Sequence, residues 1–195
     1  MSGTSVDGID VSLVRTNGID LIRLNINYFY KYSPEIKDFF LEVISQDVKR
    51  NLKRKKLLDK IITLQHFEAV KKSNFLEHYD LVGFHGQTIY HNPLNKVSVQ
   101  LGNPELLSKM LKKKVAFNFR SKDIKLGGQG APLAPVYHKL IIDSLNLEPP
   151  SCILNIGGVA NLTYWDGVNL IGFDTGPGNG LMDSFIKAKT NQYFD

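Results

Sequence analysis

Two short glycine-rich turns in this sequence have the composition of phosphate-binding loops. The first, Gly3-Thr4-Ser5, lies in the opening segment MSGTSVDGID, and the second, Gly157-Gly158, lies in ILNIGGVANLT. Glycine and small hydroxyl residues leave backbone N–H groups accessible, and such groups bind anions. Neither a Walker loop nor the G-x-G-x-x-G fingerprint is present, so an ordinary tight turn remains the alternative for each segment.

Three aspartates are candidates for metal binding or proton transfer. Asp7 and Asp10 stand beside the first glycine turn, where carboxylates would hold Mg²⁺ next to a bound phosphate. The alternative is that Asp7-Gly8 serves the turn alone. Asp174 falls at the predicted C-terminal end of a strand, where α/β folds place their ligands. It is a candidate general base, and its alternative role is to cap the turn before a helix that begins at Leu181.

A second group of candidates contains histidine, arginine and further glycines. His85 and His91 lie six residues apart, but no third metal ligand is evident, so we expect a loop histidine that hydrogen-bonds a ligand. Arg120 follows a predicted strand and either pairs with an anionic group or lies on the surface. The glycines of Gly127–Pro132 indicate a close approach by a ligand or another backbone, with a mobile loop as the alternative.

The hydrophobic pattern predicts an α/β protein that positions these residues. The chain has 195 residues, of which 43% are apolar, enough for one full domain and part of another. Alternation predicts strands, and apolar stripes at helical spacing predict helices. The predicted strands cover residues 9–15, 20–32, 81–84, 97–101 and 115–119, two strands flank the turn in 153–163, and another ends at Asp174. One predicted helix starts at Ser33. A second contains the apolar residues Leu57, Ile61 and Leu64 and runs to about Leu76. Three further helices cover residues 104–114, 136–145 and 181–189.

A second α/β unit is predicted to begin after Pro149-Pro150. The pattern of strand, glycine turn and strand in Ile153–Thr163 repeats that of Gly3–Val14. Two glycine hairpins separated by alternating strands and helices indicate a duplicated architecture with a cleft between the halves. We therefore predict a first domain over residues 1–148 and a second that begins at residue 149.

Composition and charge argue against several classes of protein. The net charge of +5 comes largely from Lys49–Lys56 and Lys112–Lys114. No aromatic residues interleave with these cations, so we expect solvated helix surfaces and no nucleic-acid partner. The N-terminus lacks a signal-peptide pattern and no apolar run approaches ~18 residues, so we expect a cytoplasmic protein with no membrane partner. The single cysteine, Cys152, lies in an apolar segment and is expected to be buried.

Five motifs, in their order and spacing, closely resemble the anhydro-N-acetylmuramic acid kinase family. They are MSGTSVDGID, GFHGQT, FRSKDIKLGGQGAPLAP, LNIGGVANLT and GFDTGPGNGLMD, and they extend over essentially the whole chain. The resemblance implies the actin-like ATPase and sugar kinase superfamily. The implied fold is a ribonuclease H-like α/β domain with a mixed sheet and flanking helices, followed by the opening strands of a second such domain.

The resemblance also implies an activity in peptidoglycan recycling. Enzymes of this family open the anhydro bridge of 1,6-anhydro-N-acetylmuramic acid with water and transfer the γ-phosphoryl group of ATP to O6, with Mg²⁺. The product is N-acetylmuramic acid 6-phosphate. By the same resemblance, Asp174 would activate the attacking water and Asp7 would hold Mg²⁺.

The remaining site residues take their roles from the matching motifs. Those implied to bind the nucleotide phosphates are Gly3, Thr4, Ser5, Val6, Asp7, Gly8, Ile9, Asp10, Gly157 and Gly158. Those implied to bind the sugar are His85, Gly86, Gln87, Thr88, Arg120, Gly128, Gln129, Gly130 and Asn155.

The sequence also departs from the family pattern. The first strand lacks its leading half, Asn118 stands where the family usually has aspartate, and only about 45 residues follow Pro150, fewer than a domain needs. We therefore expect a kinase truncated at both ends that turns over poorly by itself. An inactive remnant and one half of a split enzyme completed by a second polypeptide both stay open, as does a homodimer.

Overall fold

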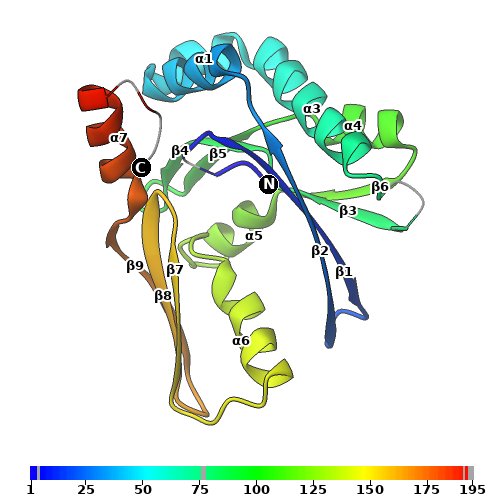
Figure 1. Cartoon of the computed structure of the whole chain (residues 1–195), viewed down its shortest axis with the longest axis vertical. Coiled ribbons are helices and arrows are strands. Elements are labelled where there is room, and N and C mark those ends of the chain that lie inside the picture. Colours follow the sequence, from blue (N-terminus) through cyan, green and yellow to red (C-terminus); the bar gives the residue numbers. More distant parts are fainter. Residues whose placement is uncertain (4, 76–77, 191, 193–195) are drawn as a thin grey trace. The chain divides into compact units, whose positions relative to one another are not determined.

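The computed structural model describes residues 1–3, 5–75, 78–190 and 192, and the chain divides into two compact units. The first unit comprises Met1–Arg15 and Ile22–Gly130, and the second comprises Thr16–Leu21 and Ala131–Asp195. Helices and strands occur in both (Figure 1), which confirms the predicted mixed α/β class. Thr4, a predicted phosphate ligand, and Leu76, the predicted end of a helix, lie outside the described residues.

The first unit combines paired strands with five helices among its described residues. In chain order its elements are β1 (Gly8–Thr16), β2 (Leu21–Lys31), α1 (Pro34–Ser45), α2 (Val48–Lys53), α3 (Lys55–Lys72), β3 (Leu81–Phe84), β4 (Gln87–Asn92), β5 (Val97–Leu101), α4 (Pro104–Leu111), β6 (Lys114–Phe117) and α5 (Phe119–Lys125). Strand β1 pairs with β2, β3 pairs in parallel with β6, and β4 pairs antiparallel with β5. Residues 16–21, at the tip of the first hairpin, group with the second unit.

Local capping signals place several of these elements where the sequence predicts them. In the turn between β1 and β2, Asn17 Oδ1 accepts the N–H groups of Ile19 at 2.9 Å and of Asp20 at 2.7 Å. Helix α1 begins after Ser33, whose side chain accepts the N–H of Ile36. Because such side chains satisfy backbone N–H groups that lack partners within the helix, they fix where the helix begins.

One apolar core holds the first unit together, and α3 supplies much of it. The buried core residues are Val6, Ile9, Tyr32, Phe40, Val43, Leu58, Ile62, Ala69, Val70, Phe84, Leu101, Leu107 and Leu111. Leu57 and Leu64, which identified this helix in the sequence, are 55% and 38% exposed. The buried face is therefore offset by one residue from the predicted one. The sequence does not distinguish the two, because α3 contains adjacent apolar pairs such as Leu57-Leu58. Two neighbouring faces of the helix therefore both show apolar residues at helical spacing.

Three short elements of the first unit were not predicted. Helix α2 precedes α3, β4 begins at Gln87 where a loop was expected, and α5 fills the segment after β6. Arg120 consequently lies on a helix and not directly after a strand. Helix α4 also ends at Leu111, earlier than predicted, because Lys112 adopts a left-handed conformation with φ of +54°. Helices and strands of six or seven residues, such as these three, are too short to show a clear hydrophobic period.

The second unit contains a three-stranded antiparallel sheet. Helix α6 (Ala134–Ser144) precedes β7 (Ser151–Ile156), β8 (Val159–Trp165) and β9 (Leu170–Pro177), and α7 (Asn179–Thr190) follows. The strand order is β7-β8-β9. Ile153 lies opposite Thr163, so the predicted pattern of strand, glycine turn and strand is confirmed.

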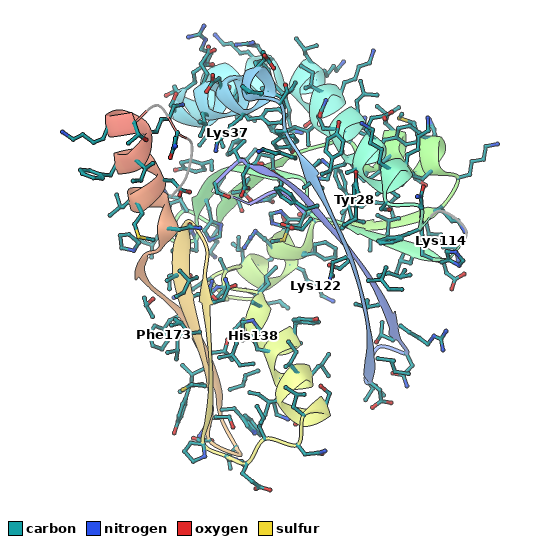
Figure 2. The ribbon with its side chains drawn as sticks, in the orientation of Figure 1. Tyr28, Lys37, Lys114, Lys122, His138 and Phe173 are labelled. Carbon is teal, nitrogen blue, oxygen red and sulfur yellow. The ribbon has the colours of Figure 1, made fainter. Side chains whose placement is uncertain are left out.

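Helix α6 packs against one face of this sheet. His138 Nδ1 lies 2.7 Å from Thr163 Oγ1, and the Lys139 ammonium lies 4.4 Å from the centre of the Trp165 ring. Pro135 contacts the backbone of Gly172 so closely that a side chain there would have no room. Figure 2 shows His138 on this side of the sheet and Phe173 on the other.

The opposite face of the sheet is apolar and exposed. Residues that face one another across antiparallel strands point to the same side. The two registers therefore gather Cys152, Leu154, Ile156, Leu162, Tyr164, Ile171 and Phe173 on this face. Ile156 is 61% exposed and Phe173 49%. Cys152 is exposed as well, so the expectation of a buried cysteine was wrong, because it assumed that both faces of the strand are covered.

The two compact units divide between Gly130 and Ala131, which groups α6 with β7–β9. The predicted domain boundary between residues 148 and 149 stays a prediction. Among the described residues, no helix combines the length and the apolar character needed to cross a membrane.

A buried histidine in the core of the first unit carries a prediction for stability. His66 Nδ1 lies 2.8 Å from the carbonyl oxygen of Ile62, and its ring stacks edge-on against Phe84. Its Nε2 has no hydrogen-bond partner among the described residues. Burial, followed by the charge of the N-terminal ammonium group, lowers the pKa of His66 to about 3.

We expect the free energy of unfolding to fall as the pH drops below about 6.5, because the unfolded chain protonates this histidine and the folded chain does not. The contribution of His66 is complete above the unfolded pKa and is lost toward pH 3. It amounts to about 2 kcal/mol between about pH 7 and pH 5. Urea denaturation at the two pH values should show a smaller difference for His66→Leu. The exposed His78→Leu should keep the wild-type difference, and an equal difference in both variants would contradict the prediction.

Candidate functional site

The N-terminal glycine turn takes its conformation from the core of the first unit. Val6 is fully buried and has a φ of +51°, which β-branched residues rarely adopt. Its N–H donates to the Gly3 carbonyl at 3.4 Å, and Gln87 Nε2 donates to the same oxygen at 3.3 Å. The hydroxyl of Tyr32 also donates to Ser2 Oγ, and both side chains are buried. Strained backbone of this kind persists only where its surroundings determine it.

Two carboxylates accompany this turn. Asp7 Oδ1 accepts a hydrogen bond from Ser5 Oγ at 2.8 Å, and the Asp7 carbonyl accepts the N–H of Tyr32. Partial burial raises the pKa of Asp10, the N-terminal ammonium opposes that shift, and the Asp7 carboxylate adds to it. Asp7 and Asp10 are therefore close enough to interact electrostatically. The structure places both predicted carboxylates beside the turn, along with Gly8 and Ile9 at the start of β1.

The predicted sugar-site motif at residues 85–88 crosses from a turn into β4. Gly86 has a φ of +72°, and a side chain there would collide with the Leu101 carbonyl. The Gln87 side chain is 1% exposed and contacts Gly3, while Thr88 Oγ1 accepts a weak hydrogen bond from Gln100. Contact of Gln87 with a sugar stays a prediction. Its observed contact links β4 to the N-terminal turn.

His85 and Arg120 form a direct pair. Arg120 Nε donates to His85 Nε2 at 3.0 Å, and Arg120 Nη1 donates to the Gly130 carbonyl at 2.6 Å. Because Nε2 accepts, the proton of the neutral ring is on Nδ1, which lies 3.0 Å from the Gly86 carbonyl. Burial and then the Arg120 charge lower the pKa of His85. His85 is thus held neutral, and both ring nitrogens already have partners.

The glycine-rich segment after α5 wraps around the end of its own helix. Asp123 Oδ2 accepts the N–H of Gly130 at 2.7 Å, and a Cβ at Gly128 would lie 2.3 Å from the same oxygen. A Cβ at Gly130 would collide with Ile124. These two glycines are therefore required by the close approach of Asp123 and Ile124. Gln129, between them, is exposed.

In the second unit, the Gly157-Gly158 turn is attached to the start of α7. Asn179 N–H donates to the Gly157 carbonyl at 2.9 Å, and Gly178 N–H donates to the Gly158 carbonyl at 3.0 Å. A Cβ at Gly178 would lie 2.0 Å from the Gly157 carbonyl oxygen. The carbonyl oxygens of the turn thus accept two N–H groups at the N-terminal end of α7, and these hydrogen bonds fix the turn against the helix.

A row of three polar residues crosses the sheet on the face that α6 covers. Asn155 lies opposite Asn161, and Asn161 lies opposite Asp174. Asn161 was not predicted as a site residue, and its side-chain oxygen is buried without a hydrogen-bond partner among the described residues. The signal was present in the sequence, because Asn155 and Asn161 are nearly symmetric about the glycine turn. Only the pairing with β9 adds Asp174 to the row.

The position of Asp174 differs from the prediction. It was expected at the end of a strand, but β9 continues through Pro177, and a register shift between Ala160 and Asn161 lies opposite it. Asp174 is exposed. The continuation is stabilised by Thr175, whose hydroxyl donates to the Ala160 carbonyl at 3.1 Å.

The candidate residues therefore form two sets, one in each unit. The first unit brings together the N-terminal turn, Gln87, and the His85–Arg120–Gly130 contact. The second brings together Asn155, Asn161, Asp174 and the Gly157-Gly158 turn. Within the described part of the chain, no group of three or more histidine, cysteine, aspartate or glutamate side chains is arranged to bind a metal.

These features define a mixed α/β protein with two glycine turns and an acidic residue on a sheet surface. The profile of the anhydro-N-acetylmuramic acid kinase family matches residues 1–195. The chain belongs to this family.

Curated relatives with the name anhydro-N-acetylmuramic acid kinase match all of this chain. The relative from Pelagibacter ubique is 42% identical, that from Nitrobacter winogradskyi 39%, and that from Agrobacterium fabrum 37%. The match covers 55%, 56% and 56% of their respective lengths. The chain thus spans about half the length of the curated relatives that it matches.

We predict that Gly178→Ala detaches the glycine turn of β7–β8 from α7, because its Cβ would overlap the Gly157 carbonyl. Overpacking of this kind costs about 1–3 kcal/mol. Gly157→Ala is the matched control, since the nearest atom to its Cβ lies at 3.7 Å. Hydrogen exchange at the backbone amides of residues 178 and 179, relative to the intrinsic rate of each sequence, should accelerate only in Gly178→Ala. Equal exchange in the two variants would refute the role of this contact.

We also predict that Arg120→Met raises the pKa of His85 toward its ordinary value. The substitution removes the second cause of the lowered pKa and frees Nε2 to bind a proton, while burial, the first cause, remains. An NMR titration of the His85 ring measures the change. Lys122→Met removes an exposed cation from the same helix and should leave the titration unchanged. An unaltered His85 titration in Arg120→Met would disprove the contact.

Proposed function

We propose that this chain carries active-site residues of a kinase that opens 1,6-anhydro-N-acetylmuramic acid and phosphorylates O6, in an actin-like ATPase fold. The observation that carries the proposal is the family match over residues 1–195. The relatives' name states the reaction of those proteins, and this chain has about half of their length. The reaction consumes ATP and yields N-acetylmuramic acid 6-phosphate, in the cytoplasm.

The two glycine turns support a phosphate-binding role. A Cβ at Gly3 or Gly157 would meet no described atom closer than 3.7 Å, and neither residue has a positive φ. Their own surroundings therefore do not require glycine, in contrast to Gly8, where a Cβ would collide with Tyr30 and Phe29. A bound phosphate that needs the open backbone explains both glycines. Ser5, Val6, Asp7, Ile9, Asp10 and Gly158 complete the proposed contacts, with Thr4 outside the described residues.

Asp7 is the residue that we assign to Mg²⁺. Mg²⁺ binds one or two carboxylates and keeps several waters, so it does not need a three-residue cluster. Asp7 lies on the proposed phosphate turn, and its carboxylate has one hydrogen bond from Ser5. When bound, the ion neutralises charge on the nucleotide phosphates.

Asp174 is our candidate base for the sugar reaction. It takes a proton from the water that attacks the anomeric carbon, a bond from that water to C1 forms, and the C1–O6 bond breaks. The freed O6 attacks the γ-phosphorus of the co-substrate ATP, the bond from that phosphorus to the β–γ bridging oxygen breaks, and ADP leaves. The proton on Asp174 then passes to solvent. Asn155 binds the sugar, and Asn161, which lies between Asn155 and Asp174 in the register, orients the carboxylate.

The residues of the first unit would bind the sugar through fixed groups. Because both nitrogens of His85 have partners, His85 positions Arg120 and the turn at Gly86 and does not exchange protons. Arg120 in turn fixes Gly130, so Gly128, Gln129 and Gly130 present a defined backbone to the sugar. Gln87 is buried and supports the N-terminal turn from below the protein surface, and Thr88 follows it in β4.

The test is an assay with the anhydro-sugar, ATP and Mg²⁺ in two arms, with the phosphorylated sugar detected by mass spectrometry. One arm contains this chain alone. The other adds the part of the Pelagibacter ubique relative that this chain does not match. Product in either arm supports the proposal, and we expect it in the second. No product in either arm, with a full-length relative active in parallel, would favour an inactive remnant.

We predict that Asp174→Asn, in the arm that turns over, abolishes ring opening and phosphorylation together while the sugar still binds. Loss of a general base typically costs about 10²–10⁴-fold in rate, and we expect the upper end. Asp143→Asn, which removes an exposed carboxylate of α6, is the control and should retain activity. Both products are followed by mass spectrometry and sugar binding by calorimetry. Near-normal turnover of Asp174→Asn would contradict the general-base role and show that the Asp174 carboxylate has only a structural role.

A further inference from the structure

Helices α2 and α3 of the first unit concentrate positive charge. The segment Lys49–Lys72 is rich in lysine and arginine, and its only acidic residues are Asp59 and Glu68. Asp59 is already engaged, because its carboxylate lies 2.6 Å from the Lys55 ammonium and accepts the N–H of Gly102 at 2.9 Å. The surface of these two helices therefore has an excess of positive charge.

The position of this charge is unfavourable for the folding of α3. A helix N-terminus has a partial positive charge, so cations in the first turn lower the stability of the helix. The first turn of α3 contains Lys55 and Lys56 and no acidic residue. Arg54, at the N-cap position, makes no side-chain hydrogen bond to the helix backbone. Helix stability therefore does not explain these cations, whereas an anionic partner does.

Every exposed residue of α3 is either a lysine or a leucine. They are Lys56, Leu57, Lys60, Leu64, Lys71 and Lys72. Among the described side chains of α2, the exposed ones are Arg50, Leu52 and Lys53. We call these residues of the two helices the basic face. Leu57 is 55% exposed and Leu52 46%, and Figure 1 shows α3 on the outside of the first unit.

Exposed leucines between cations are suited to the surface of an anionic lipid bilayer. Lysine and arginine attract headgroup phosphates, and leucine side chains enter the boundary between headgroups and acyl chains. Lysine stems can lie along apolar groups while their ammonium groups stay with the headgroups. We propose that the basic face docks α2 and α3 onto a bilayer that contains anionic phospholipid. A nucleic acid fits this surface less well, because no exposed aromatic residue alternates with the cations and its phosphates give the leucines no apolar contact.

Docking of this kind needs no membrane span. The expectation of no membrane partner rests on the lack of a long apolar run, which concerns helices that cross a bilayer. A helix that lies in the plane of the interface needs only a basic and partly apolar surface. The basic face contains none of the residues proposed for the kinase reaction, so the two proposals can be tested separately.

The test is sedimentation of the chain with lipid vesicles, without sugar or ATP. One set of vesicles is phosphatidylcholine alone, and the other is phosphatidylcholine and phosphatidylglycerol in equal parts. At low salt we expect binding to the anionic vesicles to be at least about tenfold tighter than to the neutral ones, since each cation near an anionic surface adds about fivefold. The difference should shrink as added sodium chloride screens the attraction.

Two variants separate the contributions of charge and of apolar surface. Lys56→Gln combined with Lys60→Gln should weaken binding to anionic vesicles at least about tenfold. Leu57→Gln should weaken it at least about threefold and leave its salt dependence unchanged. Because Lys56 lies in the first turn of α3, its replacement should not lower the melting temperature, so a loss of binding is distinguished from a loss of folding.

The matched control is Lys122→Gln combined with Lys125→Gln. It removes two exposed lysines from α5 and changes the net charge by the same amount as the first variant. Figure 2 shows Lys122 in a part of the first unit away from α3. This control should bind anionic vesicles as the wild type does.

Three outcomes would overturn the proposal. The first is the absence of binding to anionic vesicles at low salt. The second is equal weakening by the two double variants, which would show that net charge alone attracts the chain to the vesicles. The third is tighter binding to duplex DNA that depends on Lys56 and Lys60 but not on Leu57, which would assign the basic face to nucleic acid. The presence or absence of kinase turnover changes none of these outcomes.

Discussion

The register of β7, β8 and β9 is the constraint on which the second unit depends. Because side chains alternate between the faces of a strand, a shift by one residue would exchange everything on the two faces. The observed register places Asn155, Asn161 and Asp174 together on the side that α6 covers. The same register leaves an uncharged apolar surface on the other side. The polar row and the exposed apolar face are therefore both consequences of one strand register.

In the first unit, buried polar contacts have the corresponding role. The Gly3 carbonyl accepts hydrogen bonds from Val6 and from Gln87, a residue of β4. The glycine turn is thereby tied to a core whose main contributor is α3. Arg120 makes a similar connection between the turn at His85 and Gly130. In both cases a side chain from a strand or helix fixes the backbone carbonyl of a loop.

The glycines separate into two groups with different physical reasons. Gly86, Gly128, Gly130 and Gly178 are required by close neighbours within the protein, since a side chain would collide with them. Gly3 and Gly157 have no such neighbours. This difference supports the proposal that the two turns face phosphates, whereas the glycine-rich segment after α5 has a structural reason for its composition. The resemblance assigns Gly86, Gly128 and Gly130 to ligand binding along with Gly3 and Gly157, because the sequence does not show what lies beside each glycine.

The sequence by itself determined the family, the α/β class and most elements that carry clear local signals. Ser33 and Asn17 mark α1 and the first hairpin through hydrogen bonds within a few residues, and such signals are local. The pair Gly157-Gly158 predicts the turn between β7 and β8 by a local signal of the same kind. Tertiary structure decided the rest: which side of α3 is buried, the placement of Asn161 beside Asp174, and the exposure of Cys152. Each of these depends on residues far apart in the chain, and local periodicity contains no information about which distant element will pack against a given face.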